Sequence, residues 1–223
     1  MVQIKEIFPG VYEFGKFILT KNMVPGKKVY GEEHINHEGI EYRVWDPFRS
    51  KLGAAIKKGL KEMPIKEGSV VLYLGAAEGT TISHVSDIVG ERGVVFGVDI
   101  SARAMQKFIY LCEDRKNIVP ILADGNLPHT YKEEMGGYRP DVIFQDVSQK
   151  NQAQIFLKNS RMHLKMDGWG MLTVKARSIS AKGSAKDLYA GETKQLEAEF
   201  DLKEVISLEP FEKEHAMAVG RRK

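Results

Sequence analysis

The sequence predicts an α/β protein in which a small antiparallel β domain precedes a mostly parallel sheet with helices on both faces. Before Pro47, short β-type runs are separated by turn residues such as Gly15 and the pair Pro25 and Gly26. After it, apolar runs of strand length alternate with amphipathic stretches of helical periodicity, which is typical of a parallel sheet covered by helices. We therefore expect two domains, residues 1–48 and 49–223.

The N-terminal domain is predicted from short runs rich in aromatic and β-branched residues. The runs are residues 11–14, 17–20, 28–30 and 40–45. Between them, His34 and His37 lie close to several glutamates, but neither Cys nor another His accompanies them, so we expect a solvated loop and no metal site. Trp45 ends an apolar run and is expected to pack in the core or against the second domain.

The second domain begins with a predicted helix and continues as alternating strands and helices. The predicted strands are residues 70–74, 94–98, 118–122, 141–144, 171–174, 205–208 and 216–219. The helical faces are Leu52, Ile56, Leu60 and Met63; Ile82, Val85 and Val89; Met105, Phe108, Ile109 and Cys112; and Leu188, Leu196 and Phe200. Cys112 is the only cysteine, so no internal disulfide forms, and we expect a packed thiol and not a nucleophile.

Composition and charge limit the class of protein. The chain begins without a basic flank and apolar core, and no stretch approaches the roughly 20 apolar residues that span a membrane. We expect a cytoplasmic protein without membrane contact. The formal net charge is +3, with clusters that suit a polyanion or a solvated helix face. The clusters are Lys57, Lys58 and Lys61, and Lys175, Arg177, Lys182 and Lys186.

A Gly-rich turn, GAAEGTT at residues 75–81, follows the first strand of the second domain. It lacks the G-x-G-x-x-G spacing that binds a dinucleotide, which disfavours a nicotinamide enzyme. It resembles the cofactor-binding turn of class I methyltransferases, where glycines let the backbone approach S-adenosylmethionine. Asp99 follows one helix and one strand later, the distance at which a carboxylate accepts hydrogen bonds from ribose hydroxyls. The alternative is an ordinary turn and an Asp that caps the next helix.

Five residues that suit ligand binding stand at the ends of five predicted strands: Gly75, Asp99, Asp124, Asp146 and Lys175. Ligands of open α/β sheets bind outside these carboxyl ends, so we expect one shared site, although any single Asp there also suits a helix cap. Asp124 is placed to accept a hydrogen bond from the exocyclic amine of adenine, and Gly125 leaves room for the ring.

Six runs resemble the fibrillarin family of RNA-guided 2′-O-ribose methyltransferases: RSKLGAAI, VLYLGAAEGTTISHVSDIVG, NIVPILAD, DVIFQDVSQ, VKARS and LEPFEKEHAMAV. The chain lacks the Gly/Arg-rich N-terminal extension of nucleolar members and resembles the short archaeal type. Glu78 and Gly125 depart from the family pattern. The resemblance implies a class I S-adenosylmethionine-dependent methyltransferase with a Rossmann-like, seven-stranded, mostly parallel sheet and no metal. The cofactor-binding residues that it implies are Gly75, Ala76, Ala77, Gly79, Thr80, Thr81, Asp99, Ile100, Asp124, Gly125, Asp146 and Gln149.

The resemblance further implies a catalytic set made of Lys51, Asp146, Lys175 and His215. A ribose hydroxyl must lose its proton as its oxygen attacks a methyl group, so a base and a positioning clamp are needed. We expect Lys175 to be the base and Asp146 to hold both amines. Lys175 and Lys51 would each lower the pKa of the other. His215 would orient Lys175 or relay the proton. Alternatively, positioning supplies most of the rate and the proton leaves to water.

Less specific explanations exist for each member of this set: a surface lysine at Lys51, a helix-capping Asp146, a phosphate-binding Lys175 and a core His215. The family also implies partners, namely a box C/D guide RNA with its rRNA or tRNA target, a Nop-family scaffold protein and a kink-turn-binding protein. Candidates for contacts with RNA phosphates are Arg49, Arg103, Arg177 and Lys182. Three rival classes stay open: a protein glutamine methyltransferase, a non-catalytic RNA-binding subunit and a small-molecule methyltransferase.

Overall fold

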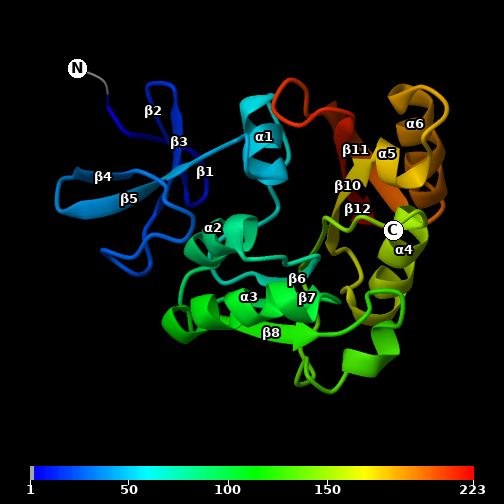
Figure 1. Ribbon diagram of the computed structural model, residues 1–223, viewed down its shortest axis with the longest axis horizontal. Coiled ribbons are helices and arrows are strands. Elements are labelled where there is room, and N and C mark those ends of the chain that lie inside the picture. Colours follow the sequence, from blue (N-terminus) through cyan, green and yellow to red (C-terminus); the bar gives the residue numbers. More distant parts are fainter. Residues whose placement is uncertain (1–2) are drawn as a thin grey trace.

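The computed structural model describes residues 3–223 and contains two sheets (Figure 1). The first is antiparallel, with the strand order β1-β2-β3-β5-β4. Its strands are β1 (Lys5–Phe8), β2 (Val11–Phe14), β3 (Phe17–Lys21), β4 (His34–His37) and β5 (Ile40–Trp45). The second has the order β11-β12-β10-β9-β6-β7-β8, and β12 runs antiparallel to both of its neighbours.

The second sheet alternates with helices along the chain, as the sequence predicts. Its elements are α1 (Lys51–Lys57), β6 (Val70–Leu74), α2 (Thr80–Val89), β7 (Val94–Asp99), α3 (Ala102–Asp114), β8 (Ile118–Leu122), the 3₁₀ helix η1 (Pro128–Tyr131), β9 (Val142–Gln145), α4 (Gln152–His163), β10 (Trp169–Lys175), α5 (Ala176–Ile179), α6 (Ala185–Leu196), β11 (Phe200–Ser207) and β12 (His215–Arg222). From β6 the chain builds outward to β7 and β8, then returns to β9 on the other side of β6. This reversal of strand order leaves a crevice at the carboxyl ends of β6 and β9, where ligands of such sheets bind.

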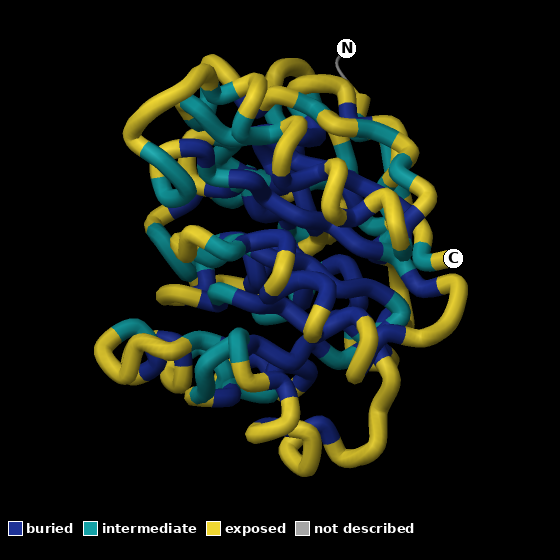
Figure 2. Tube along the Cα trace, turned by 90° about the vertical axis from the view of Figure 1, so that its right-hand side faces the viewer, coloured by how far each residue is buried: buried dark blue, intermediate teal, exposed yellow. Residues whose placement is uncertain are grey.

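Two apolar layers cover the faces of this sheet. Val71 and Tyr73 point to the layer that contains α1, α2 and α3, whereas Leu72 and Leu74 point to the layer of α4 and α6. This alternation follows from the two-residue period of a strand and explains why apolar runs without polar positions form these strands. Figure 2 shows the buried segments in the middle of the molecule, with exposed loops around them.

Buried charges join the two sheets. Arg43 of β5 donates to Asp87 of α2 at 2.7 Å and to Glu32 at 2.6 Å, and Arg115 reaches the other oxygen of Asp87 at 2.6 Å. All four side chains are at most 1% exposed. Burial would lower the pKa of Arg43, but Asp87 and Glu32 outweigh it and raise that pKa. The N-terminal sheet is therefore fixed on α2, the helix that begins at the Gly-rich turn.

Several N-terminal predictions are wrong. Residues 28–30 form no strand, because the Val29 and Tyr30 N–H groups donate to the carboxylate of Glu32 and not to a neighbouring strand. The segment containing His34 and His37 is strand β4 and not a solvated loop, and the nearby Glu32 is buried. Trp45 packs between the domains as expected, because its ring stacks on His84 at 4.6 Å.

Three helical predictions need correction. Helix α6 ends at Leu196, so Phe200 does not share its face and instead begins strand β11. The first helix ends at Lys57 and does not extend to Met63, because Gly59 adopts a φ of +88° and its N–H bonds back to the Ile56 carbonyl. Ile109 is 46% exposed, although Met105 and Phe108 on the same helix are buried as predicted. Cys112 packs against the core, and burial raises the pKa of its thiol to about 12, as expected for an unreactive thiol.

No helix within residues 3–223 is both long and apolar enough to cross a bilayer.

Candidate active site

The Gly-rich turn after β6 is shaped by close contacts with two other strand ends. Gly75 has a φ of +88°, and a Cβ atom there would lie 2.6 Å from the carbonyl oxygen of Asp146. The Gly75 N–H donates to the Val98 carbonyl of β7 at 2.8 Å. Gly79 has a φ of +98°, and a Cβ there would clash with the side chain of Leu111 of α3. Gly75 is therefore needed to pack the turn against the ends of β7 and β9, and Gly79 is needed to pack it against α3.

Glu78, which departs from the family pattern, reaches toward helix α3. Its carboxylate pairs with Lys107 of α3 at 2.6 Å, and the two side chains are 59% and 64% exposed. Such an exposed pair adds little to stability. The turn keeps its shape without a small residue at this position.

The strand ends enclose a cavity of about 340 Å³. All five residues predicted at strand ends line it. Of the other predicted cofactor-binding residues, Ala77, Ile100, Gly125 and Gln149 line the same cavity. Ala76, Thr80 and Thr81 line an adjoining cavity of about 220 Å³ that shares Lys51, Gly75, Ala77 and Asp146 with the first, whereas Gly79 lines neither.

Two carboxylates hold defined positions in the larger cavity. Asp99 accepts from the Ala77 N–H through one oxygen and from the Ser101 N–H through the other, both at 2.8 Å. Asp124 accepts from the Asn126 N–H through Oδ1 at 2.8 Å. Each carboxylate is thus oriented by the backbone and retains lone pairs for a ligand. A Cβ at Gly125 would lie 3.5 Å from Ile155, an ordinary contact, so alanine also fits there.

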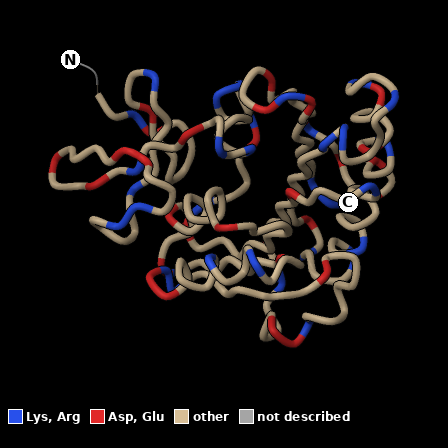
Figure 3. Tube along the Cα trace, in the orientation of Figure 1, with Lys and Arg blue, Asp and Glu red and all other residues tan. Residues whose placement is uncertain are grey.

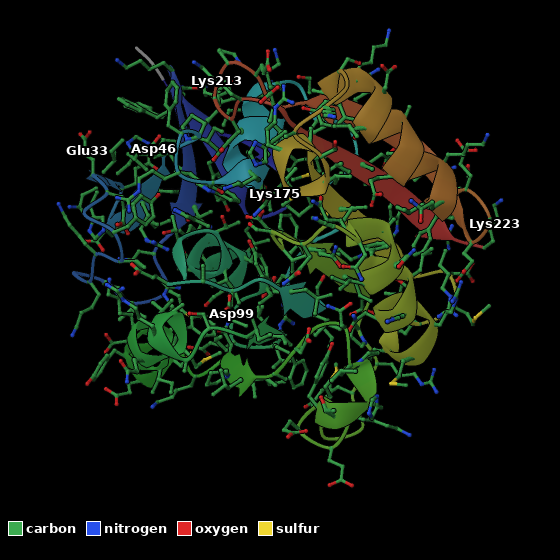
Figure 4. The ribbon with its side chains drawn as sticks, turned by 45° about the vertical axis from the view of Figure 1, so that its right-hand side comes forward. Glu33, Asp46, Asp99, Lys175, Lys213 and Lys223 are labelled. Carbon is green, nitrogen blue, oxygen red and sulfur yellow. The ribbon has the colours of Figure 1, made fainter. Side chains whose placement is uncertain are left out.

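Asp146 stands between two lysines that come from different elements. Lys175, at the end of β10, lies 2.8 Å from Oδ1 of Asp146, and Lys51, at the start of α1, lies 3.8 Å from Oδ2. The Lys175 amine also donates to the Asp146 carbonyl and to Ser148 Oγ, both at 3.0 Å. Figure 4 shows the labelled Lys175 near the middle of the molecule, beside the cyan helix α1.

The position of Lys51 follows from the start of its helix. Ser50 is the N-cap of α1, and its buried hydroxyl accepts from the Gly53 N–H at 3.2 Å and from Thr81 at 3.0 Å. Lys51 is the first helical residue, where the helix dipole disfavours a cation.

A second carboxylate, which the sequence does not single out, compensates this cation. Glu212 lies 3.3 Å from the Lys51 amine. Burial acts to lower the pKa of Lys51, but Asp146 and Glu212 outweigh it, and the pKa lies above its ordinary value. The expected lowering of this pKa is therefore wrong. The only signal for Glu212 in the sequence is its place in the run LEPFEKEHAMAV, three residues before His215.

None of the remaining predicted residues lines the larger cavity. His215 opens β12 opposite Lys175 in the strand register, but its Nδ1 contacts the Lys213 carbonyl at 2.6 Å and it does not line the cavity. Arg49 lines the smaller cavity, and Arg177 pairs with Glu214. Arg103 and Lys182 are exposed and line neither cavity.

Comparisons with known proteins agree with this geometry. The fibrillarin family model matches residues 2–223. The fibrillarin-like rRNA/tRNA 2′-O-methyltransferase of Thermococcus onnurineus is 51% identical over 223 residues, 98% of each chain.

Three solved structures share the whole fold. The pre-rRNA processing fibrillarin of Methanococcus jannaschii superposes with a TM-score of 0.95 at 45% identity, covering 100% of this chain and 98% of the other. Aeropyrum pernix fibrillarin, solved with natively bound S-adenosyl-L-methionine, superposes with a TM-score of 0.87 at 40% identity, covering 99% of this chain and 100% of the other. A chain of a fibrillarin/Nop5p complex superposes with a TM-score of 0.89 at 36% identity, covering 98% of this chain and 100% of the other. The expected fold class is confirmed, and this chain belongs to the fibrillarin family.

Proposed function

We propose that this chain is the methyltransferase subunit of a box C/D guide-RNA ribonucleoprotein. It transfers a methyl group from S-adenosylmethionine to the ribose 2′-hydroxyl of guided nucleotides in rRNA and tRNA. The observation that carries the proposal is the grouping of Lys51, Asp146 and Lys175 at the edge of a cavity that also presents Asp99 and Asp124. The names of the Thermococcus and Aeropyrum relatives support the RNA substrate and the cofactor, respectively.

The residues of the larger cavity fit S-adenosylmethionine. Asp99 would accept hydrogen bonds from the ribose hydroxyls, Asp124 would accept from the adenine amine, and Gly125 leaves space for the ring. The turn at Gly75 would approach the amino-acid end without a Cβ in the way. When bound, the cofactor supplies a methyl group on a sulfonium, which makes the methyl carbon electrophilic.

The lysines then divide two tasks. Lys51, whose pKa is raised, stays a cation and holds the ribose oxygen together with Asp146. Lys175 takes the hydroxyl proton as the oxygen–carbon bond forms and the carbon–sulfur bond breaks, the electron pair of the latter staying on sulfur. His215 would act only through Lys175, its neighbour in the strand register. The alternative remains that alignment supplies most of the rate and the proton leaves to water.

The partners follow from the relatives and from the charge distribution. The solved complex with Nop5p supports a Nop-family scaffold for this chain, to which the proposal adds a guide RNA and a kink-turn-binding protein. Lys and Arg are interspersed with Asp and Glu on most elements (Figure 3) and form no single long stripe. An enzyme with such a surface suits a substrate that other subunits deliver. Arg49, Arg103, Arg177 and Lys182 are the proposed phosphate contacts, and the proposed location is the cytoplasm.

A methyl-transfer assay tests this function. Labelled S-adenosylmethionine is supplied to the chain with a matched guide and target RNA, with and without the scaffold and kink-turn proteins. We expect ribose methylation at one guided nucleotide, dependent on the guide and on both proteins. Labelling of protein alone would support the protein glutamine methyltransferase instead. No transfer from the complete particle would favour a non-catalytic subunit.

A further inference from the structure

Glu212 belongs to a loop that reaches the site from the far edge of the sheet. The loop spans residues 208–214 between β11 and β12. Because β12 runs antiparallel to β10, the end of β11 and the start of β12 lie at the same edge as the carboxyl ends of the parallel strands. The loop is drawn in red beside the cyan helix α1, and Lys213 is labelled on it (Figure 4).

The loop is held in place by contacts other than the ion pair, both within the loop and with the segment before α1. The ring of Phe211 packs edge-on against Phe48, three residues before Lys51, with the centroids 5.0 Å apart. The N–H groups of Phe211 and Glu212 both bond to the carbonyl of Leu208, a fully buried residue. The position of Glu212 therefore follows from the fold and not only from its attraction to Lys51.

The Glu212 carboxylate changes the charge balance around Asp146. The side chains of Lys51 and Glu212 are 22% and 17% exposed, so solvent screens their 3.3 Å pair only in part. With Glu212, two lysines face two carboxylates. Without it, both lysines would compete for the single carboxylate of Asp146.

We propose that Glu212 is a positioning residue for methyl transfer, which holds Lys51 as a cation on the Oδ2 side of Asp146 and leaves Lys175 as the only amine that takes the proton. This inference rests on the proposed function. Glu212 touches neither the cavity for the cofactor nor the reacting atoms, and it acts through Lys51.

The pH dependence that follows is set by the groups around Lys51. They are Asp146 after β9, Lys175 at the end of β10, Glu212 in the loop, Arg49 before α1 and Tyr73 of β6. Glu212 is one of the two carboxylates that keep the pKa of Lys51 above its ordinary value. Its removal lowers that pKa, so Lys51 loses its proton at a lower pH.

The test compares Glu212→Gln, which keeps the shape and removes the charge, with Glu212→Asp, which keeps the charge. Glu209→Gln is the matched control, since it removes a carboxylate from the same loop and still offers an oxygen to the Glu214 N–H. Single-turnover methyl transfer by the assembled particle is measured against pH with saturating cofactor and RNA. We expect Glu212→Gln to slow transfer by about 10- to 100-fold and to move the alkaline limb of the profile down by about one pH unit.

Unfolding and cofactor-binding measurements should give values close to wild type for all three variants, and Glu212→Asp should restore part of the rate. A profile for Glu212→Gln whose limbs stay at the wild-type pH would overturn the positioning role, even if the rate falls. A second readout does not need RNA: the pKa of the Lys51 amine, measured by NMR after reductive ¹³C-methylation, should fall in Glu212→Gln and stay unchanged in Glu209→Gln. An unchanged Lys51 pKa contradicts the inference. If the wild-type particle did not methylate RNA, this result would instead contradict the proposed function.

Discussion

Gly75 illustrates at the scale of one residue how the backbone shapes the site. Two features require glycine at this position: the positive φ, and the Asp146 carbonyl oxygen that would lie 2.6 Å from a Cβ atom. Gly59 has the same φ of +88°, but no atom would lie within 4 Å of a Cβ there. We expect Gly59→Ala to lower the free energy of unfolding by about 1 kcal/mol, the cost of the left-handed backbone. Gly75→Ala should cost about 2–4 kcal/mol and abolish cofactor binding, because Asp146 must move. Chemical denaturation and calorimetric titration measure both effects, and equal costs for the two variants would contradict this account.

Lys175 carries the proton transfer in the proposed mechanism. Replacing it with Met removes the amine that contacts Asp146 and Ser148. We expect single-turnover transfer to fall by about 10²- to 10⁴-fold, the usual contribution of a positioned base, and the residual rate to rise with pH until Lys51 loses its proton. An unchanged rate and pH profile would exclude the general-base role and favour alignment as the main source of catalysis.

The sequence predicts the site residues that follow parallel strands, because each apolar run ends at the edge where ligands bind. Asp99, Asp124 and Asp146 meet at one cavity for this reason. The place of Glu212 in the site cannot be predicted in the same way. Its loop joins two strands that lie at the sheet edge out of chain order, so its nearness to Lys51 depends on strand order, which the sequence pattern does not fix.

At the scale of elements, α4 and β4 show why some predictions fail. Helix α4 buries polar residues such as Asn159 and His163, which bond to the Gly125 and Pro128 carbonyls at 2.8 and 3.0 Å. A helix that buries polar side chains lacks a continuous apolar stripe, so the sequence pattern does not predict it. The strand β4 is similarly rich in polar residues and is recognised only through its pairing with β5. By contrast, the central strands β6 and β7 are continuous apolar runs and match their predicted ranges closely.

The start of α1 is an element whose cap serves the site. Ser50 is fully buried and bonds to Gly53 and Thr81, whereas Ser101 caps α3 in an exposed position through the Ala104 N–H at 3.2 Å. We expect Ser50→Ala to cost about 1–2 kcal/mol of unfolding free energy and Ser101→Ala about 0.5–1 kcal/mol. Only Ser50→Ala should slow methyl transfer, because it loosens the turn that positions Lys51. Urea unfolding and the transfer assay together decide this, and a normal transfer rate in Ser50→Ala would show that the cap does not position Lys51.

At the scale of the whole molecule, the buried charges decide how the two sheets behave. We propose a domain boundary between residues 48 and 49, but Arg43 on one side and Asp87 and Arg115 on the other form one network. Removing one partner of such a network leaves an uncompensated buried charge. The proposed boundary therefore separates two sheets that are joined by the buried Arg43–Asp87 ion pair. We expect the two sheets to unfold together, because separating them would remove this partner from both groups.

The histidine inside this interface links the stability of the whole chain to pH. His84 is fully buried and contacts Thr20 and Tyr30 at 2.8 and 2.7 Å. Burial, together with the Arg43 and Arg115 guanidinium groups, holds the pKa of His84 well below its ordinary value of 6.5. Burial also lowers the pKa of His163. Below pH 6.5 the unfolded chain therefore binds protons that the folded chain does not, and the free energy of unfolding falls as the pH falls.

We expect this loss to approach about 1.4 kcal/mol per pH unit for His84 between pH 6.5 and 5. His163, whose pKa is lowered less strongly, adds a smaller loss. The carboxylate of Glu32, whose pKa is lowered, adds its own loss only below its ordinary value of 4.5. His84→Gln should lower stability at every pH but remove its share of the slope, leaving that of His163. The exposed His129, changed to Gln, is the control and should leave the slope unchanged. Urea unfolding at half-unit pH steps measures the slope, and an identical slope in His84→Gln and wild type would mean that His84 is protonated inside the fold, in conflict with its two cationic neighbours.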